Sequence, residues 1–196
     1  MLDKTGGRLQ QNVDEAMDQA RQLASERKFI QALEMLASWS RQDQPEEYAA
    51  AVKALEEEIR AQQAQESEMQ VMQEKEALDA QWQKALEMFD HRQFDQSIVL
   101  FEELVDTPYQ GQARAKISEA VNLAATELRK EAASLFIKAR KTNDVDQKKA
   151  LLLESRRLLL LVQQKYPQAD IIDKVRQNQK ATEDQLRALE PNLPTE

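Results

Sequence analysis

The stretch Lys149–Pro167, KALLLESRRLLLLVQQKYP, places seven leucines in a chain that is otherwise strongly polar. A membrane-spanning helix needs about 20 predominantly apolar residues, and here Glu154, Arg156 and Arg157 interrupt the run. A leucine zipper repeats its apolar positions over several heptads, whereas these leucines surround about two turns of helix. A helix that is apolar on two sides needs neighbours on two sides, so the stretch predicts the central helix of a packed array.

The composition of the whole chain predicts an all-α protein. Its 196 residues include three glycines, and none of them lies between Arg8 and Gln110. Sheet proteins depend on glycine-bearing turns. The most abundant residues here (Ala, Leu, Glu, Gln, Lys and Arg) are instead the stronger helix formers.

Three prolines mark a long internal period. Pro45, Pro108 and Pro167 are 63 and 59 residues apart, and each follows an apolar helical stretch. Proline is well tolerated in the first turn of a helix, so we expect each proline to open a new helix. Thr107 is expected to be the N-cap before Pro108.

Shifting the chain by 65 residues aligns residues 27–36 with residues 92–101. The matching pairs are Ala20/Ala85, Leu23/Met88, Arg27/Arg92, Phe29/Phe94, Gln31/Gln96, Ala32/Ser97 and Leu36/Phe101. Small residues let two helices approach where they cross, and large residues fill the space beside the crossing. The pattern therefore predicts two copies of a helix, a tight turn and a second helix.

This order of small and large residues resembles the tetratricopeptide repeat family. The first copy matches through Ala20, Leu23, Ala32, Leu36 and Pro45, and a degenerate third copy keeps Ser155, Leu159, Val162 and Pro167. The resemblance covers roughly residues 14–187 and departs from the family's period of about 34 residues. It implies an α-solenoid of about three helical hairpins. The extra length of each repeat predicts long connecting helices over 45–91 and 109–141, the second from apolar residues that recur every three or four positions. A C-terminal capping helix is expected over 169–189.

The segment Lys165–Asp170, leading into another helix, resembles the repeat ends of bacterial envelope lipoproteins of the outer-membrane assembly type. That resemblance implies a location on the periplasmic side of a bacterial envelope. The first residues, Met1–Arg8, are typical of a sequence in which an initiator methionine has been added after the removal of an export signal. We therefore expect an N-terminal lipid anchor that this sequence has lost, and no direct membrane span.

We expect four regions in the chain. Residues 1–12 form a flexible N-terminal tether, and residues 13–63 form a helical hairpin with its connecting helix. Residues 64–189 form a C-terminal helical-repeat body, and residues 190–196 a frayed tail. The apolar stripe is lost over residues 60–68, which are a hinge or a continuous helix; helix is favoured because no residue there breaks one.

The sequence contains no pattern that is typical of a catalytic, cofactor or metal site. There is no cysteine, and the single histidine, His91, has no second histidine to help it ligate zinc. Consecutive glutamates such as Glu56, Glu57 and Glu58 point in different directions around a helix, so their carboxylates do not meet at one site. We therefore predict no enzyme activity, no cofactor and no metal.

The charge is uneven along the chain. Residues 1–100 carry 11 Lys/Arg against 20 Asp/Glu, and residues 101–196 carry 16 against 15, within a net charge of −8. An acidic chain is a poor nucleic-acid binder, so we predict none. The basic residues of the second half are a solvated helix face, or they contact an anionic protein partner or the acidic half of another copy.

Candidate partner-binding residues fall in two groups. Aromatic and apolar residues of the second hairpin are expected to line a peptide-binding groove, or else to pack between neighbouring repeats. The candidates are Trp82, Leu86 and Phe89 for the groove and Arg129, Lys130, Arg140 and Lys141 for the basic half. Arg21 of the first hairpin is a further candidate, because it lies at a position where some tetratricopeptide repeats bind a peptide's C-terminal carboxylate.

Two functions agree with these patterns. The first is a non-catalytic scaffold or adaptor that binds another protein or peptide, in bacterial envelope assembly. The alternative is a self-associating, dimeric helical spacer, which the apolar residues Met69, Val71 and Met72 on the long connecting segment favour.

Overall fold

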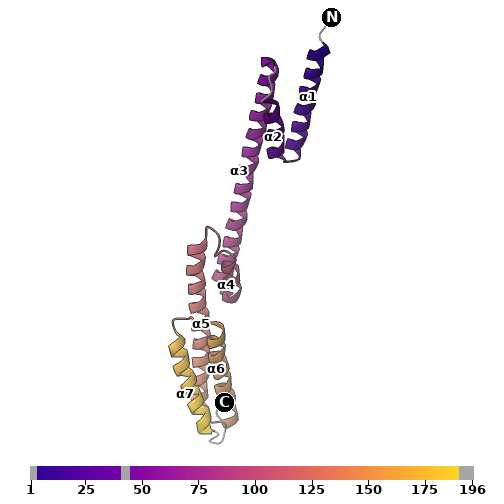
Figure 1. Cartoon of the computed structure of the whole chain (residues 1–196). Helices are drawn as coiled ribbons and strands as arrows, with labels where there is room; N and C mark the ends of the chain where they lie inside the picture. The colour runs from indigo at the N-terminus through magenta and orange to yellow at the C-terminus, as the bar shows by residue number, and fades with distance from the viewer. Residues whose placement is uncertain (1–3, 41–44, 190–196) are drawn as a thin grey trace. The chain divides into compact units, whose positions relative to one another are not determined.

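The computed structural model describes residues 4–40 and 45–189, and all regular secondary structure within them is helical. The helices are α1 (Lys4–Ser25), α2 (Phe29–Ser40), α3 (Glu46–Asp90), α4 (Phe94–Glu102), α5 (Gln110–Lys141), α6 (Val145–Lys165) and α7 (Ile172–Leu189), as drawn in Figure 1. The prediction of an all-α protein is confirmed.

The chain divides into two compact units, an N-terminal unit of residues 1–76 and a C-terminal unit of residues 77–196. The division falls inside α3, which continues as helix through residues 60–68, the alternative that the sequence favoured. Residues 4–12, which belong to the expected N-terminal tether, are helical and form the first turns of α1. The two glycines there each weaken the helix by only about 1 kcal/mol, and the apolar spacing of the later turns continues the helix. The predicted tail, residues 190–196, lies outside the described residues.

Both short helical turns have the same backbone geometry. Arg27 and Arg92 adopt the left-handed conformation, with φ of 62° and 61°. In each turn two N–H groups donate to carbonyls of the preceding helix: Arg27 to Ala24 and Lys28 to Leu23 in the first, Arg92 to Phe89 and Gln93 to Met88 in the second, all at 2.9 Å. These are the two hydrogen bonds of the Schellman motif, whose left-handed residue is usually glycine.

Each of these arginines also forms an ion pair with a glutamate further along the chain. Arg27 Nε lies 2.6 Å from Glu66 Oε1 of α3, and Arg92 contacts the Glu127 carboxylate of α5 through its Nη2. Each turn is thus joined to the helix that follows its hairpin. The two glutamates do not align in the 65-residue shift, so the internal repeat does not predict these ion pairs.

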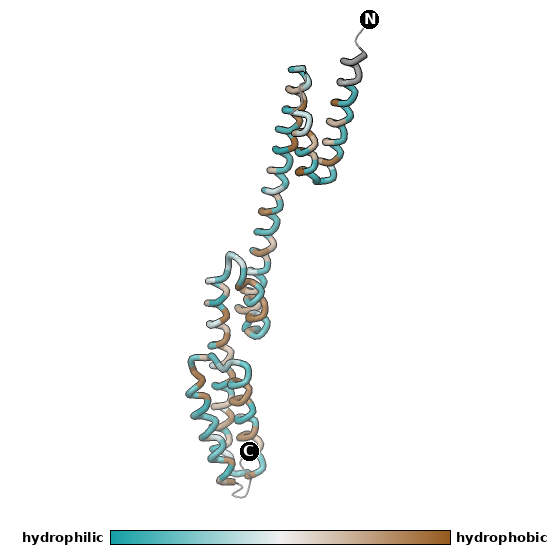
Figure 2. The backbone as a smooth tube through the Cα atoms, in the orientation of Figure 1, coloured by the Kyte–Doolittle hydropathy of each residue, from teal (hydrophilic) through white to brown (hydrophobic). Residues whose placement is uncertain are grey.

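The core of the N-terminal unit lies between α1, α2 and the first turns of α3. Its buried members from α3 are Val52, Leu55 and Ile59. From the first hairpin, Ala20, Ala32 and Leu36 are buried completely. In Figure 2 hydrophobic and hydrophilic positions alternate along these helices, as expected for helices with one buried face.

In the C-terminal unit, α6 packs against both α5 and α7, which contact each other much less. Its buried residues Leu152, Leu158, Leu159 and Val162 come from the leucine-rich stretch. This confirms that the stretch is a central helix with neighbours on two sides. In the part of the chain that the structure describes, no helix is long and apolar enough to cross a bilayer.

A polar contact joins the start of α4 to the end of α6. Asp95 accepts hydrogen bonds from Lys165 Nζ, at 2.5 Å, and from the hydroxyl of Tyr166, whose side chain is buried. These hydrogen bonds, from Lys165 first and then from Tyr166, lower the pKa of the Asp95 carboxyl below its ordinary value. Burial and the hydrogen bond to Asp95 raise the pKa of the Tyr166 phenol.

Two of the expected helix starts require correction. The capping helix α7 begins at Ile172 and not at residue 169, because Asn122 Oδ1 accepts the Asp170 N–H at 2.8 Å and holds the preceding turn. Thr107 is not the N-cap of α5: its hydroxyl accepts the N–H of Tyr109, the residue in the N-cap position, at 3.2 Å.

Replacing Arg27 by glycine or by alanine separates the backbone strain of the first turn from its ion pair. Both changes remove the contact with Glu66, but only glycine relieves the left-handed backbone. We expect Arg27→Gly to have a free energy of unfolding about 1 kcal/mol above that of Arg27→Ala. Urea unfolding followed by far-UV circular dichroism measures the difference, and equal stabilities would contradict a strained turn.

Replacing Asp95 by asparagine tests the contact between α4 and α6. Because the folded pKa of Asp95 lies below its unfolded value, its contribution is complete above the unfolded pKa and disappears as pH falls through the folded pKa. We expect Asp95→Asn to lose about 1 kcal/mol of unfolding free energy at neutral pH, and the loss to vanish in acid. Asp90→Asn, an equal change of charge, is the control; a loss independent of pH would contradict the expectation.

Candidate interaction groove

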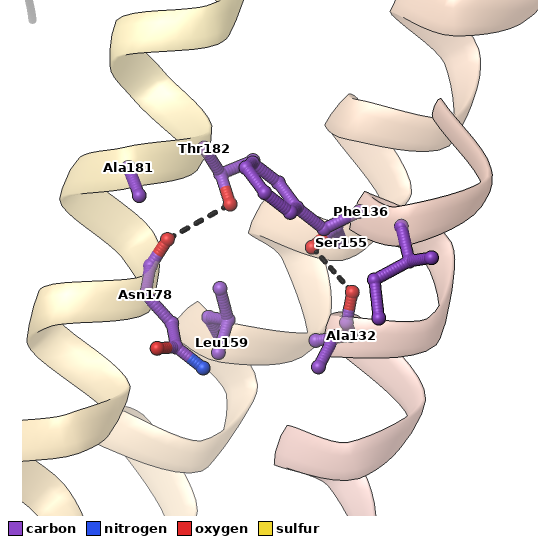
Figure 3. Close-up of a pocket in the computed structure, with 9 residues that line it drawn as sticks. Ala132, Phe136, Ser155, Leu159, Asn178, Ala181 and Thr182 are labelled. Carbon is purple, nitrogen blue, oxygen red and sulfur yellow. Dashed lines mark hydrogen bonds between the residues drawn. The ribbon is translucent and has the colours of Figure 1, made fainter. Parts of the chain in front are cut away.

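A pocket of about 220 Å³ opens between α5, α6 and α7. Figure 3 shows Ala132 and Phe136 of α5 facing Asn178 and Thr182 of α7, with Leu159 of α6 between them. The further lining residues are Ala133, Ile137, Ser155 and Ala181. We call this surface the α5–α7 groove. The alanines leave the space open, because longer side chains at these positions would fill it.

The polar groups of the groove are mostly engaged within their own unit. Ser155 Oγ donates to the Ala132 carbonyl at 2.8 Å, and Thr182 Oγ1 donates to the Asn178 carbonyl at 2.9 Å (Figure 3). The Asn178 side-chain amide makes no hydrogen bond with the described residues. The groove therefore offers an apolar space with one available amide, which suits a bulky apolar side chain beside a polar backbone.

Four basic residues of α5 lie about one helical turn from the residues that line the groove. Two of them precede the lining residues and two follow them. Arg129 and Lys130 precede Ala133 by four and three residues, and Arg140 and Lys141 follow Phe136 and Ile137 by four. Residues three or four apart lie on the same face of a helix. These are the four basic residues that the sequence predicts to bind a partner. None of the four lines the pocket itself, and helical spacing places each of them one turn from a lining residue. Their partner-binding role stays a prediction.

Within the described residues these cations have no acidic partner. Lys130, Arg140 and Lys141 are exposed and form no ion pair with a described residue. The Nε of Arg129 is shielded from solvent and has no hydrogen-bond acceptor. On the α7 wall, Lys174 precedes Asn178 by one turn and is also exposed and unpaired.

The acidic residues of α7 are already neutralised. Asp173 pairs with Arg176 at 3.1 Å, Asp184 with Arg187 at 3.6 Å, and Glu183 with Arg156 at 3.3 Å. On α5, Glu131 lines a different hollow, beside α4 and the end of α6. The unpaired charge next to the α5–α7 groove is therefore positive.

The aromatic candidate Trp82 lies in a hydrophobic cluster of the C-terminal unit. Its ring stacks on Tyr109, with centroids 4.9 Å apart and planes 7° apart, and tilts against Phe101 at 5.1 Å. The hydroxyl of Tyr109 donates to Asp79 at 2.6 Å, which raises the pKa of the Tyr109 phenol. These contacts agree with the alternative that the aromatic residues pack between neighbouring helices.

The other candidates of that group are also engaged. Leu86 and Phe89 are half-buried against the same cluster. The Phe89 ring meets Phe94 edge to face at 5.7 Å and carries Lys116 Nζ 4.4 Å from its centre. Arg21 is exposed on α1, in the other unit, and pairs with Asp18 at 2.9 Å. A partner-binding role for these residues stays a prediction.

The described residues contain no group of three or more His, Asp or Glu side chains placed to hold a metal ion. His91 is exposed at the second turn, where its Nδ1 donates to the Glu87 carbonyl at 2.7 Å.

No family model, curated protein or solved structure matches this chain.

Extending Ala181 tests whether the groove is an open space. Ala181→Leu adds three carbons that enter the pocket, and each buried carbon contributes about 0.8 kcal/mol at most. Ala150→Leu makes the same change at a position of α6 that, like Ala181, is exposed but does not line the pocket. We expect the first variant to have an unfolding free energy about 1 kcal/mol above the second. Urea unfolding measures both, and an Ala181→Leu variant that is the less stable of the two would mean that the pocket is already filled.

Proposed function

We propose that this chain is a non-catalytic protein-interaction module and that the α5–α7 groove is its docking surface. The observation that carries the proposal is the combination of an apolar pocket with unpaired arginines and lysines on its rim. That chemistry fits an acidic protein segment that presents one or two bulky apolar side chains. Amphipathic helices bind such grooves by inserting anchors spaced three or four residues apart.

The proposed architecture is an α-solenoid of helical hairpins that resembles tetratricopeptide repeats. Two turns with the same hydrogen bonds and the same left-handed arginine support it. Complete burial of Ala20 and Ala32 in one hairpin and of Ala85 and Ser97 in the other supports it further. In such an arrangement the long helices α3 and α5 each close one hairpin and begin the next.

The positive charges beside the groove determine which partners it favours. Cations at both ends of an apolar pocket attract acidic partners and disfavour basic ones, which governs association rate and specificity more than affinity. The pocket is smaller than the roughly 300–1,000 Å³ typical of small-molecule sites. A protein side chain is therefore the better occupant. A scaffold role in bacterial envelope assembly rests on the sequence resemblance alone.

A second candidate function is a self-associating helical spacer. Met69, Val71 and Met72 of α3 are 50%, 63% and 57% exposed, in a segment otherwise made of polar residues. Exposed apolar side chains grouped on one helix are typical of a surface that contacts another protein.

An amphipathic peptide tests the docking surface. The probe is a fluorescent helical peptide with leucines spaced three and four residues apart and glutamates elsewhere; a second peptide carries lysines in place of the glutamates. We expect the acidic peptide to bind with a Kd on the order of 10 μM and the basic peptide not to bind. Arg140→Glu/Lys141→Glu is expected to weaken binding about tenfold or more, and Ala181→Leu to abolish it.

Fluorescence anisotropy measures each Kd. The matched control, Lys53→Glu/Lys84→Glu, changes the net charge equally at exposed lysines remote in sequence from the groove. Equal binding of both peptides, or equal weakening by the control, would contradict a docking role for the α5–α7 groove.

A further inference from the structure

We propose that the occupant of the α5–α7 groove is residues 66–76 of α3 from a second copy of this chain. The inference rests on the proposed docking function and names its partner. It joins two surfaces that the described structure leaves open, one in each unit.

The segment 66–76, with the sequence ESEMQVMQEKE, is an exposed helix with apolar anchors. The buried α3 residues of the N-terminal core end at Ile59. Further along α3, Met69 lines an open hollow beside the first turn and stays 50% exposed, and Met72 is 57% exposed. Met69 and Met72 are three residues apart and therefore share one helical face. Methionine is flexible and polarisable, and it adapts to irregular apolar pockets.

The charge of the segment is opposite to that of the groove. It contains four glutamates against one lysine, and the whole N-terminal unit has 9 Lys/Arg against 16 Asp/Glu, a net charge of −7. Glu66 is paired with Arg27, whereas Glu68, Glu74 and Glu76 form no ion pair with a described residue. With the methionines in the apolar pocket, these carboxylates would meet the cations one turn away on α5.

The alternative pairing, α3 against α3 of a second copy, is less favoured by the same residues. A stable coiled-coil seam needs apolar residues at two positions of each heptad over three or four heptads. Between residues 60 and 76 the positions in register with Met69 and Met72 are Gln62, Gln65 and Glu76. Such a seam would also bring acidic segments together, whereas the groove neutralises them.

A contact between two different surfaces of two copies is heterologous. When two copies pair in this way, one copy keeps a free segment 66–76 and the other keeps a free groove. Copies therefore add head to tail and form open chains or closed rings, unlike a two-fold dimer. This difference makes the proposal testable with full-length chains alone.

The experiment uses two complementary variants. Met69→Glu/Met72→Glu removes the anchors and keeps the groove, while Ile137→Glu/Arg140→Glu removes the groove and keeps the anchors. All four positions are exposed, so both variants are expected to fold. Sedimentation velocity up to about 200 μM, a range that detects weak contacts, gives the mass of each species. Val99→Glu, which places one glutamate at another exposed apolar residue, is the control for an apolar-to-acidic change on the surface.

We expect the parent chain and the control to grow in mass with concentration, and the apparent Kd to rise at least about tenfold between about 50 and 500 mM salt. Each variant alone is expected to remain a monomer. Their mixture is expected to form a complex of one copy of each, because one intact segment meets one intact groove. Ala181→Leu, which blocks the groove without changing charge, is expected to behave as the groove variant does.

Three results would overturn this inference. They are a parent chain that stays monomeric, a groove variant that self-associates like the parent, and a mixture in which the variants do not combine. Binding of the acidic peptide separates the two proposals. If the groove binds that peptide while the parent chain stays monomeric, the occupant is a different acidic protein and the proposed function stands. If the groove binds neither the acidic peptide nor a second copy of the chain, both proposals fail.

Discussion

The close approach of α5 and α6 is the constraint on which the C-terminal unit depends. Ala132 and Ser155 are completely buried where the two helices meet, and the Ser155 hydroxyl donates to the Ala132 carbonyl at 2.8 Å. Residues this small let helix backbones come close, and the hydrogen bond satisfies a hydroxyl that would otherwise be buried at a cost. Since α6 is apolar on its other side as well, α7 packs there, and the space between α5 and α7 becomes a groove with α6 as its floor.

Most of the helical architecture could be predicted from the sequence, because its determinants are local. The apolar spacing located the long helices, the scarcity of glycine excluded sheets, and the 65-residue shift aligned two turns that have the same backbone geometry. The errors lie where tertiary contacts decide. Asn122 delays the start of α7 by holding Asp170, and no local pattern contains that contact between residues 48 positions apart.

The candidate site was predictable only in part. Charge clustering identified Arg129, Lys130, Arg140 and Lys141, because like charges on one helix are visible in the sequence. The pocket beside them was not, since it is made by small residues distributed over three helices. Ala133 and Ala181 look like ordinary surface alanines until the helices are placed side by side. Conversely, Trp82 attracted attention as an aromatic residue, and its ring contacts belong to a cluster within its own unit.

The arginines at the two left-handed turns combine two effects that oppose each other. Glycine at these positions would avoid a conformational cost of about 1 kcal/mol, yet it would lose the contact to the next helix. Arg27 reaches Glu66, and Arg92 reaches Glu127. An exposed ion pair contributes about 0–1 kcal/mol, so the exchange is nearly neutral for stability. What the arginine adds is a directional link between a hairpin turn and the following long helix. In the N-terminal unit that link engages the first glutamate of the segment 66–76, immediately before its exposed methionines.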